Sequence, residues 1–289
     1  MSDSPSTKIL DHIVHLTPPG SVEATSEQFR RLGFNVIPGG THTDGLTANA
    51  LVILADGVYI ELICFTHPPS YYPPGSPERH ARDSHHWASK ALGWIDFAFV
   101  GNGSLATRIS DVINARARRD GSGAVYSPEV PGGRERTDGK VLKWLITAPE
   151  DDAKRGTLPF FCGDITPREW RVPVDPPSNT EHPSTAQGVS HVVILASPED
   201  FSSISRQLTS VTGDTPVSSN GAEIIWQLNC SKTRERGPRL LLRSAVSDAE
   251  VEFVRDAGTG IYEVGLLVKV GGRREDRSTP YGRIVWCPA

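Results

Sequence analysis

The sequence predicts an α+β fold built from repeated βαβββ modules, whose curled mixed or antiparallel sheets surround a cavity. Three times along the chain, a strand-like apolar run leads through a short turn into an amphipathic helix. Further short β-rich runs follow each helix, an order typical of an α+β protein and not of a doubly wound parallel sheet. This recurrence indicates one structural unit used several times. The three modules are expected at residues 8–66, 92–165 and 188–268.

The first module opens with a strand-like run at residues 9–16. A Pro-Pro-Gly turn follows, and Ser21 is the expected N-cap of a helix whose apolar residues recur every three or four positions. Gly33 stands where the left-handed residue after a helix belongs. Strands are then expected at residues 49–54 and 58–65, because the Asp-Gly step between them is typical of a hairpin.

The other two modules repeat this order. The second has a strand-like run at residues 94–100 and a helix that Ser104 is expected to cap. The third has a strand-like run at residues 189–195, with Ser197 as the N-cap and Pro198 at the first helical position. The further strands expected in these modules are residues 140–147, 158–162, 222–228, 239–244 and 261–268.

Two polar stretches interrupt the modules and suggest the domain organisation. Residues 67–90 have the composition of a long surface excursion, and the proline-rich residues 172–187 that of a linker. We therefore expect one domain of paired βαβββ modules at residues 8–171. A second, at residues 188–289, would hold the third module and a C-terminal strand.

The overall charge argues against two classes of partner. A net charge of -4 and a pI near 6.1 give no bulk attraction to nucleic acids or anionic lipids. No apolar run approaches the roughly 20 residues needed to cross a bilayer. We therefore expect a small-molecule substrate, no nucleic-acid or membrane partner, and a monomer or homodimer.

The cysteines and the N-terminus predict the compartment. Cys64, Cys162, Cys230 and Cys287 lie far apart without a CxxC pair, which is typical of reduced thiols. The first seven residues carry neither the basic nor the apolar region of a secretory signal. A cytoplasmic protein is expected.

The first candidate site is the pair His12 and Glu61. His12 lies in the opening strand of the first module, among apolar neighbours, and Glu61 lies in the last strand. A carboxylate in so apolar a run either faces water or is compensated, because burying a bare charge is costly. A sheet that curls around a cavity would bring the inner faces of these strands together. We therefore expect His12 and Glu61 to share an ion or a bridging water there.

His191 and Glu263 repeat this pair in the third module. The residues around His191 resemble those around His12, and the run around Glu263 resembles that around Glu61. Two histidines and two carboxylates suit a divalent ion such as Zn, Ni, Mn, Co or Fe(II). The pattern predicts a four-ligand centre, for which the third module must pack against the first and bring His191 to His12.

Two features leave alternatives open. Residues 260–263 also align with residues 188–191, so the strand of Glu263 would then open a truncated fourth copy. The middle module has Phe97 at the position of His12, and its last strand has no carboxylate. If the first two modules share the cavity, only two protein ligands remain.

Four further side chains are candidates for substrate binding. His42 follows a Gly-Gly-Thr step and is expected at the mouth of the pocket, and Asn49 opens the next strand. Arg134 and Arg136 lie in a glycine-rich hairpin. Guanidinium groups bind carboxylate or phosphate through two hydrogen bonds. The alternative for both arginines is a solvated hairpin.

Other polar groups receive weaker interpretations. Asp164 and Arg168 follow the last strand of the middle module and are candidates for closing the same cavity. His80, His85 and His86 are interpreted as solvated, because charged residues flank them.

The first module resembles the glyoxalase-like domain of the vicinal-oxygen-chelate superfamily. The resemblance lies in residues 11–14, 39–42 and 56–62, together with Thr47 and Asn49. In its metal-using members, a His on the first strand of a module and a Glu on the last supply half of the ligands, and a second module supplies the rest. The resemblance thus implies metal-binding roles for His12, Glu61, His191 and Glu263.

The same resemblance implies an enzyme, in which a divalent metal chelates two adjacent oxygens of the substrate. The metal would act as a Lewis acid while Glu61 or Glu263 moves a proton. Lyase or isomerase chemistry of the glyoxalase type is the leading hypothesis. Fe(II) dioxygenase chemistry is a variant, because two His and one carboxylate form a non-haem iron set. The alternative is a metal-free protein that binds a small molecule or tailors a natural product in the same cavity.

Overall fold

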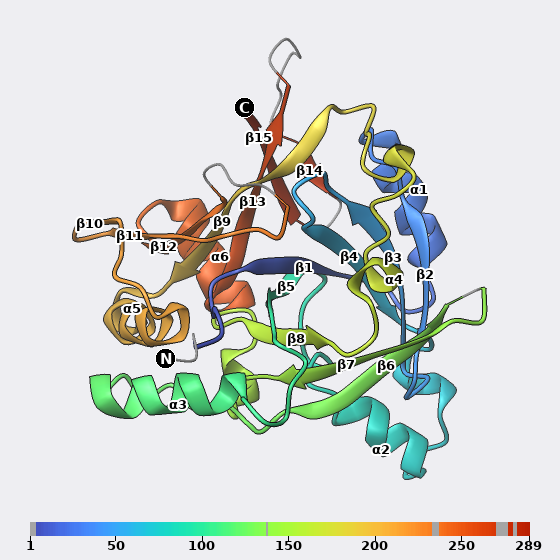
Figure 1. Cartoon of the computed structure of the whole chain (residues 1–289), viewed down its shortest axis with the longest axis horizontal. Coiled ribbons are helices and arrows are strands. Elements are labelled where there is room, and N and C mark those ends of the chain that lie inside the picture. Colours follow the sequence, from blue (N-terminus) through green and yellow to red (C-terminus); the bar gives the residue numbers. More distant parts are fainter. Residues whose placement is uncertain (1–3, 137, 233–236, 270–276, 280–281) are drawn as a thin grey trace.

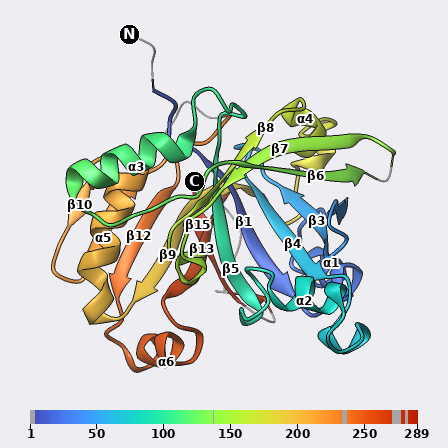
Figure 2. The ribbon, with the colours of Figure 1, turned by 90° about the horizontal axis from the view of Figure 1, so that it is seen from below.

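A computed structural model describes residues 4–136, 138–232, 237–269, 277–279 and 282–289, and these form two sheets. Eight strands close into a barrel, and seven strands of the C-terminal part form an open sheet beside it (Figure 1). Seen from below, the open sheet and the barrel lie side by side (Figure 2). Thr137, and the first three residues of the segment examined for a secretory signal, lie outside the described residues.

The barrel combines the first two modules, with the strand order β1-β4-β3-β2-β6-β7-β8-β5. The opening strand of each module runs parallel to its last strand, and the two opening strands pair antiparallel. The elements are β1 (Leu10–Thr17), α1 (Val22–Arg31), β2 (Ile37–His42), β3 (Thr47–Ile53), β4 (Tyr59–Phe65), η1 (Pro69–Tyr71), α2 (Pro77–Asp83), β5 (Gly93–Val100), α3 (Ile109–Asp120), β6 (Val130–Arg136), β7 (Val141–Thr147), η2 (Asp152–Lys154), β8 (Phe160–Asp164), α4 (Arg168–Arg171) and η3 (Pro177–Asn179).

The open sheet has the order β10-β11-β12-β9-β13-β15-β14. This matches the barrel read from β2, namely β2-β3-β4-β1-β5-β8-β7, with no counterpart of β6 among the described residues. The sheet is therefore an opened copy of the barrel. Its elements are β9 (Ala186–Ala196), α5 (Pro198–Thr212), β10 (Ser218–Ser219), β11 (Glu223–Gln227), β12 (Arg239–Ser244), α6 (Asp248–Ala257), β13 (Gly260–Val268), β14 (Arg277–Thr279) and β15 (Gly282–Pro288).

The register of the two copies corrects the position expected for Glu263. His191 pairs with Gly265 on β13, as His12 pairs with Ala98 on β5. His191 therefore occupies on β9 the position of His12 on β1. The third module ends at β12, and β13 opens a fourth, incomplete copy. Glu263 thus lies on an opening strand, at the position of Asp96, and not on a last strand as Glu61 does.

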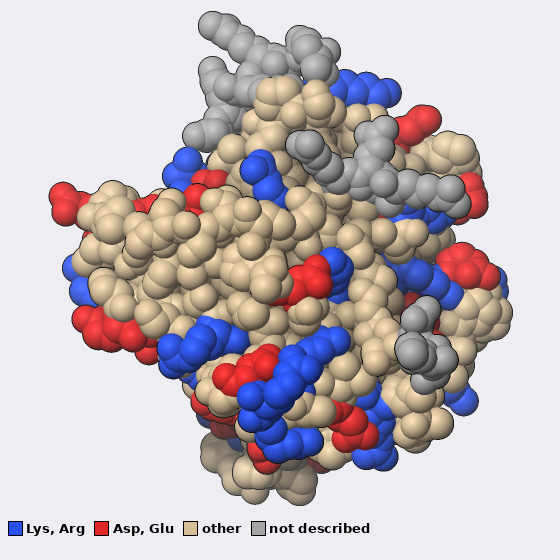
Figure 3. All heavy atoms as spheres, turned by 60° about the vertical axis from the view of Figure 1, so that its left-hand side comes forward, with Lys and Arg blue, Asp and Glu red and all other residues tan. Residues whose placement is uncertain are grey.

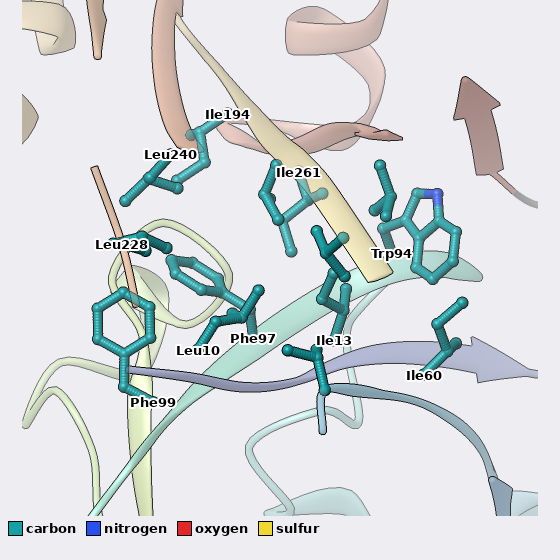
Figure 4. Close-up of a cluster of buried hydrophobic side chains, with 14 of the residues drawn as sticks. Leu10, Ile13, Ile60, Trp94, Phe97, Phe99, Ile194, Leu228, Leu240 and Ile261 are labelled. Atoms are coloured by element: carbon teal, nitrogen blue, oxygen red, sulfur yellow. The ribbon is translucent and has the colours of Figure 1, made fainter. Parts of the chain in front are cut away.

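The main hydrophobic core joins the barrel to the open sheet. Apolar side chains on the outer face of β1 and β5 pack with those of β9, β12 and β13 (Figure 4). Ile13 and Phe97 belong to this layer, together with Ile194 and Leu240, and all four are buried. A second, smaller cluster fills part of the barrel interior and includes Trp144 and Phe160. Because the main core lies outside the barrel and the second cluster fills only part of its interior, space for a cavity remains inside the barrel.

The helix boundaries follow the sequence signals in two modules and differ in one. The helix α5 begins after Ser197, whose Oγ accepts the backbone N–H of Asp200, and ends before Gly213 with φ of 74°. In the middle module, α3 begins only at Ile109. Ser104 lies in the preceding turn, where its Oγ accepts the backbone N–H groups of Ala106 and Thr107. The predicted cap at Ser104 was wrong, because this local turn uses its oxygen first.

Two barrel strands, β2 and β6, were not expected because they contain glycine pairs. A Cβ on Gly39 would lie 1.9 Å from Asn49 Oδ1, and one on Gly132 would lie 2.4 Å from Trp144 Nε1. Glycine is required where neighbouring side chains approach the strand so closely. Since glycine has a low β-propensity, these close contacts explain why the sequence did not predict the two strands.

The surface offers no large single-sign patch on the side that carries α3 and α5. Acidic and basic side chains are interspersed there (Figure 3). None of the described helices is long and apolar enough to span a membrane.

Candidate active site

The barrel encloses a cavity of about 540 Å³. Strands of both modules line it, and residues 85–87, from the segment between β4 and β5, lie at its wall. His12, Glu61, His42 and Asn49, which the sequence singled out, all lie on this cavity.

His12 projects from β1 into the cavity with a fixed orientation. Its Nδ1 lies 2.8 Å from Asp11 Oδ2, and its ring stacks on Tyr59 with centroids 4.6 Å apart. Its Nε2 lies 3.6 Å from Glu61 Oε2 on β4. A carboxylate behind a histidine fixes which ring nitrogen faces the site.

Asp11 is a buried anion that lies behind His12 and does not itself line the cavity. Although burial alone would raise its pKa, Arg168 and Arg171 hold the pKa of Asp11 well below its usual value. Arg168 Nη1 lies 2.5 Å from Asp11 Oδ1, and Arg171 Nη1 donates to Asp11 Oδ2 at 2.8 Å. Arg171 also donates to the hydroxyl of Tyr59 at 2.9 Å. Since Asp11 is ionised, the proton between it and His12 belongs to the Nδ1 of His12.

Glu61 is held from the other side by β3. Asn49 Nδ2 donates to Glu61 Oε1 at 2.5 Å, and Asn49 Oδ1 accepts the backbone N–H of Gly40. His42 Nε2 lies 3.8 Å from the same Glu61 oxygen, while its Nδ1 lies 2.8 Å from Thr47 Oγ1. Burial lowers the pKa of His42, so its ring is neutral at neutral pH.

These contacts leave two hydrogen-bond acceptors facing each other, the Nε2 of His12 and a carboxylate oxygen of Glu61. With its proton on Nδ1, a neutral His12 presents a lone pair at Nε2, opposite a carboxylate oxygen of Glu61. Two acceptors that face one another call for a proton on one of them or a cation between them. The donor set thus fits either a proton-transfer pair or a divalent cation.

Three arginines line the cavity, and among the described residues Arg134 is the one of them without an ion-pair partner. Arg155 is paired with Asp96, and Arg171 with Asp11 and Asp164. Arg134 is only 2% exposed, and its Nη1 has no hydrogen-bond partner among the described residues. A buried guanidinium without a partner is costly, so an anionic ligand is the natural complement. Arg136, two residues on, bonds to the carbonyl of Trp170 and to Asp138, and it does not line the cavity. The structure thus separates two arginines that the sequence grouped together.

The wall of the cavity also contains residues that the sequence did not indicate or that were interpreted differently. His85 and His86 line it beside Trp87. Both are half-buried in the cavity wall, so the interpretation of these two as solvated was wrong, whereas His80 is exposed as expected. Burial lowers the pKa of His85 to about 4 and that of His86 to about 2. Asp96 accepts from Trp87 Nε1 at 2.9 Å and from Arg155 Nε at 2.6 Å.

Asp96 also corrects the interpretation of Phe97. Phe97 faces the core between the barrel and the open sheet, so it does not replace His12 in the cavity. The strand alternation instead turns Asp96 toward the barrel interior, where it holds Trp87 and Arg155.

The other predicted pair lies elsewhere. His191 Nε2 lies 3.0 Å from Glu263 Oε1 on the open sheet, and neither residue lines the barrel cavity. The structure therefore does not bring His191 and Glu263 together with His12 and Glu61. The reason is topological, because the second module, and not the third, closes the barrel around His12. Asp164 and Arg168 were expected to close the cavity, and they take part in the ion-pair cluster of Asp11 below it.

Comparisons with known proteins bear out the resemblance. A family model described as a glyoxalase-like domain matches residues 10–212. The chain belongs to this glyoxalase-like family. Its fold is that of the vicinal-oxygen-chelate superfamily. No curated protein matches the sequence.

Two solved structures illustrate how the glyoxalase-like fold recurs. A hypothetical protein from Staphylococcus aureus superposes with a TM-score of 0.67 at 11% identity, covering 97% of this chain and 99% of its own. A variant of 4-hydroxymandelate synthase from Streptomyces coelicolor superposes with a TM-score of 0.54 at 12% identity. That alignment covers 92% of this chain and 72% of the synthase. At these identities the likeness concerns the fold alone.

The glyoxalase-like cavity brings together side chains of the kinds that bind metals. His12 Nε2 faces Glu61, and the neutral ring of His42 places a second imidazole nitrogen 3.8 Å from Glu61 Oε1. Within the described residues, no group of three or more histidine, cysteine or carboxylate side chains is already arranged to hold an ion. A cation bound here would therefore take His12 and Glu61 first.

Proposed function

We propose that this glyoxalase-like protein is an enzyme, a lyase or isomerase that moves a proton within a small oxygenated substrate in the barrel cavity. The observation that supports this most strongly is the meeting of His12, His42 and Glu61 in a cavity that also holds an unpartnered Arg134. Acid–base groups and an anion-binding group in one enclosed volume are what such a reaction needs.

The substrate class follows from Arg134 and the cavity walls. A guanidinium binds a carboxylate through two parallel hydrogen bonds, so Arg134 would hold an anionic end of the substrate. Tyr59, Trp144 and Phe160 supply apolar surface for the rest of the molecule. We infer a small carboxylate with an oxygen on the neighbouring carbon.

In this proposal, Glu61 is the residue that moves the proton. Its Oε1 is held by Asn49, so its Oε2 faces His12 and the cavity. As a base, Glu61 would accept a proton from the carbon next to a carbonyl and return it to the adjacent position. Asp11 keeps the Nε2 of His12 directed at Glu61, so His12 is ready to accept or share that proton.

A divalent cation, whether Zn, Ni, Mn, Co or Fe, would be held by His12 and Glu61, with His42 as the nearest third ligand. When bound, such a cation supplies Lewis-acid stabilisation of negative charge on the substrate oxygens. The residues that orient these ligands, Asp11 and Asn49, are already in place.

The first test measures binding and exchange in variants of the full chain. Pyruvate, lactate and longer 2-oxo and 2-hydroxy carboxylates serve as probes, with calorimetry for binding and NMR in D2O for loss of the C–H signal. We expect Arg134→Leu to weaken binding by about 10- to 100-fold, because a hydrogen bond to a charged group contributes about 1.5–3 kcal/mol. Arg136→Leu is the matched control and should bind as the wild type does.

The second part of the test separates chemistry from binding. Glu61→Gln should keep probe binding and lose about 10²- to 10⁴-fold of the exchange rate, the usual contribution of a general base. Exchange that survives in Glu61→Gln would contradict the proposed role. Metal content, measured on protein purified without chelator, should fall in His12→Gln. Oxygen consumption by the iron-loaded protein would instead identify a dioxygenase.

A metal-free binding protein is the second candidate, and one observation favours it. The aromatic walls would hold a bulky ligand without any catalysis, and no ready group of three metal ligands exists among the described residues. This candidate predicts tight binding that is independent of metal and no C–H exchange with any probe. The same two measurements therefore separate the two functions.

A further inference from the structure

A second cluster of reactive side chains lies on the open sheet, outside the barrel cavity. Cys287 Sγ on β15 lies 4.0 Å from His191 Nδ1 on β9. The opposite nitrogen, Nε2, lies 3.0 Å from Glu263 Oε1 on β13. Arg283 Nε lies 2.9 Å from the other oxygen of Glu263. Thiol, imidazole, carboxylate and guanidinium thus form one continuous chain.

The order of these groups determines the direction in which a proton moves. Glu263 accepts the Nε2–H of His191, which leaves Nδ1 as the acceptor that faces the thiol. The same Nδ1 lies 3.3 Å from Ser190 Oγ. A base that is oriented by a carboxylate and directed at a thiol is the arrangement that activates a cysteine nucleophile.

Gly265 allows the imidazole to take this place. A Cβ on Gly265 would lie 2.3 Å from His191 Cε1, so any other residue would displace the ring. In the barrel the corresponding residue is Ala98. The position of the His191 ring against β13 is therefore specific to the open copy.

The repeat shows that Cys287 has a counterpart in the barrel. Cys287 pairs with Leu267 on β13, and Cys162 pairs with Val100 on β5. Leu267 lies two residues after Gly265, and Val100 lies two residues after Ala98. Since Gly265 and Ala98 are equivalent in the repeat, the two cysteines are equivalent as well. Cys162 is buried in the wall of the barrel cavity, and burial raises the pKa of its thiol. Cys287 is partly exposed, near the C-terminal end of β15 and beyond the residues that pair with β14. The opened copy thus exposes a cysteine that the closed copy buries.

The charges around Cys287 favour its ionised form. The bond with His191 lowers the pKa of the Cys287 thiol, against the opposing effect of burial. Although burial opposes it, the contacts with Cys287 and Glu263 raise the pKa of His191 to about 9. Within the described part of the chain, Arg283 and Arg243 also act on Glu263, and Arg243 is itself bonded to Glu250 at 3.0 Å. Both shifts favour a thiolate beside an imidazolium over a thiol beside a neutral imidazole.

We propose that Cys287 is a modification site at which hydroperoxides oxidise the thiolate to a sulfenic acid, with His191 as the proton donor. The sulfur attacks one peroxide oxygen, so an S–O bond forms as the O–O bond breaks. The sulfur loses two electrons and the peroxide gains them. The leaving oxygen takes the proton of the His191 imidazolium, which yields water from hydrogen peroxide or an alcohol from an alkyl hydroperoxide. The product is Cys287–SOH beside a neutral His191.

The test compares four cysteines within one protein. The full chain is treated with hydrogen peroxide and dimedone, or with iodoacetamide alone, at a series of pH values, and each cysteine peptide is quantified by mass spectrometry. At pH 6.5 we expect Cys287 to react at least about tenfold faster than Cys230, which is also partly exposed, because each unit of pKa changes the thiolate fraction tenfold. Cys64 is buried away from the cavity and reports whether the fold is intact.

The variants decide whether His191 is responsible. His191→Gln should reduce labelling of Cys287 at pH 6.5 by about tenfold and move its pH midpoint upward, while Cys230 is unchanged. Reactivity of Cys64 in this variant would mean that the fold is disturbed. In that case Glu263→Gln, which removes the carboxylate bonded to the other nitrogen of His191, should also raise the pH midpoint of Cys287 labelling. Equal reactivity of Cys287 and Cys230, or a Cys287 pH profile that neither substitution changes, would overturn the proposal.

Discussion

At the scale of single residues, Asp11 connects the cavity to the stability of the fold. It is completely buried, yet it is bonded to His12 on one side and to Arg168 and Arg171 on the other. One carboxylate thus fixes the tautomer of a site histidine and neutralises two guanidinium groups. Arg171, which also contacts Asp164, reaches this position from a four-residue helix that carries no sequence signal of its own.

Replacing this carboxylate should therefore be costly. We expect Asp11→Asn to lower the free energy of unfolding by about 3 kcal/mol or more, because it leaves buried positive charge without its partner. Asp138→Asn is the control, since the Asp138–Arg136 pair is largely exposed and should contribute less than about 0.5 kcal/mol. Urea unfolding of both variants measures the difference. Equal losses would show that Arg171 finds adequate compensation in Asp164.

At the scale of elements, Asp56 in the hairpin between β3 and β4 connects the barrel to the open sheet by a hydrogen bond. Its Oδ1 accepts the backbone N–H of Val58 within the hairpin, at 3.0 Å. Its Oδ2 accepts the N–H of Val189 on β9, at 2.8 Å. Gly188 lies so close that a Cβ there would meet Oδ2 at 2.5 Å. The Asp-Gly turn predicted from the sequence is thus also an inter-sheet contact.

This contact should make stability depend on pH. Burial raises the pKa of Asp56 to about 7, against about 3.9 in an unfolded chain. Between these values the folded state binds the proton more tightly, so the contribution of Asp56 is present below about pH 4 and is lost as the pH rises to about 7. The wild-type free energy of unfolding, relative to Asp56→Asn, should fall by up to about 1.4 kcal/mol per pH unit in this window. Urea unfolding at pH 4, 5.5 and 7 measures it, and a difference that increases with pH would show that the two N–H donors outweigh burial.

At the scale of the whole molecule, the two sheets share one core. We propose that residues 8–171 and 188–289 are two domains joined by the linker 172–187, and that neither is complete alone. The outer face of β1 and β5 is covered by the open sheet, and Ile13 and Phe97, both fully buried, belong to the cluster that the two sheets share (Figure 4). The linker is itself fastened, because His182 contacts the carbonyl of Ile53 and the backbone N–H of Asn35.

Separating the domains should expose this core. A fragment of residues 1–176 is expected to be aggregated or to bind a hydrophobic dye strongly, because a contiguous apolar face of this kind is rarely left in water. The full chain, expressed and purified in parallel, is the control and should be monomeric or dimeric without dye binding. Gel filtration and dye fluorescence measure both. A soluble fragment with a cooperative unfolding transition would show that the barrel is an independent domain.

The sequence by itself determined the repeated module, because helix caps, hairpin turns and alternating apolar residues are local signals. It also determined that His12 and Glu61 lie on strands whose inner faces meet, since the period of a strand decides which side chains share a face. The tertiary structure alone decided which modules close on one another. A barrel formed by the first and second modules brings Arg134 and His86 to the same cavity as His12, and leaves His191 and Glu263 on an open sheet with Cys287. Such pairing depends on long-range packing of outer faces such as that of Phe97, which leaves no trace in the spacing of neighbouring residues.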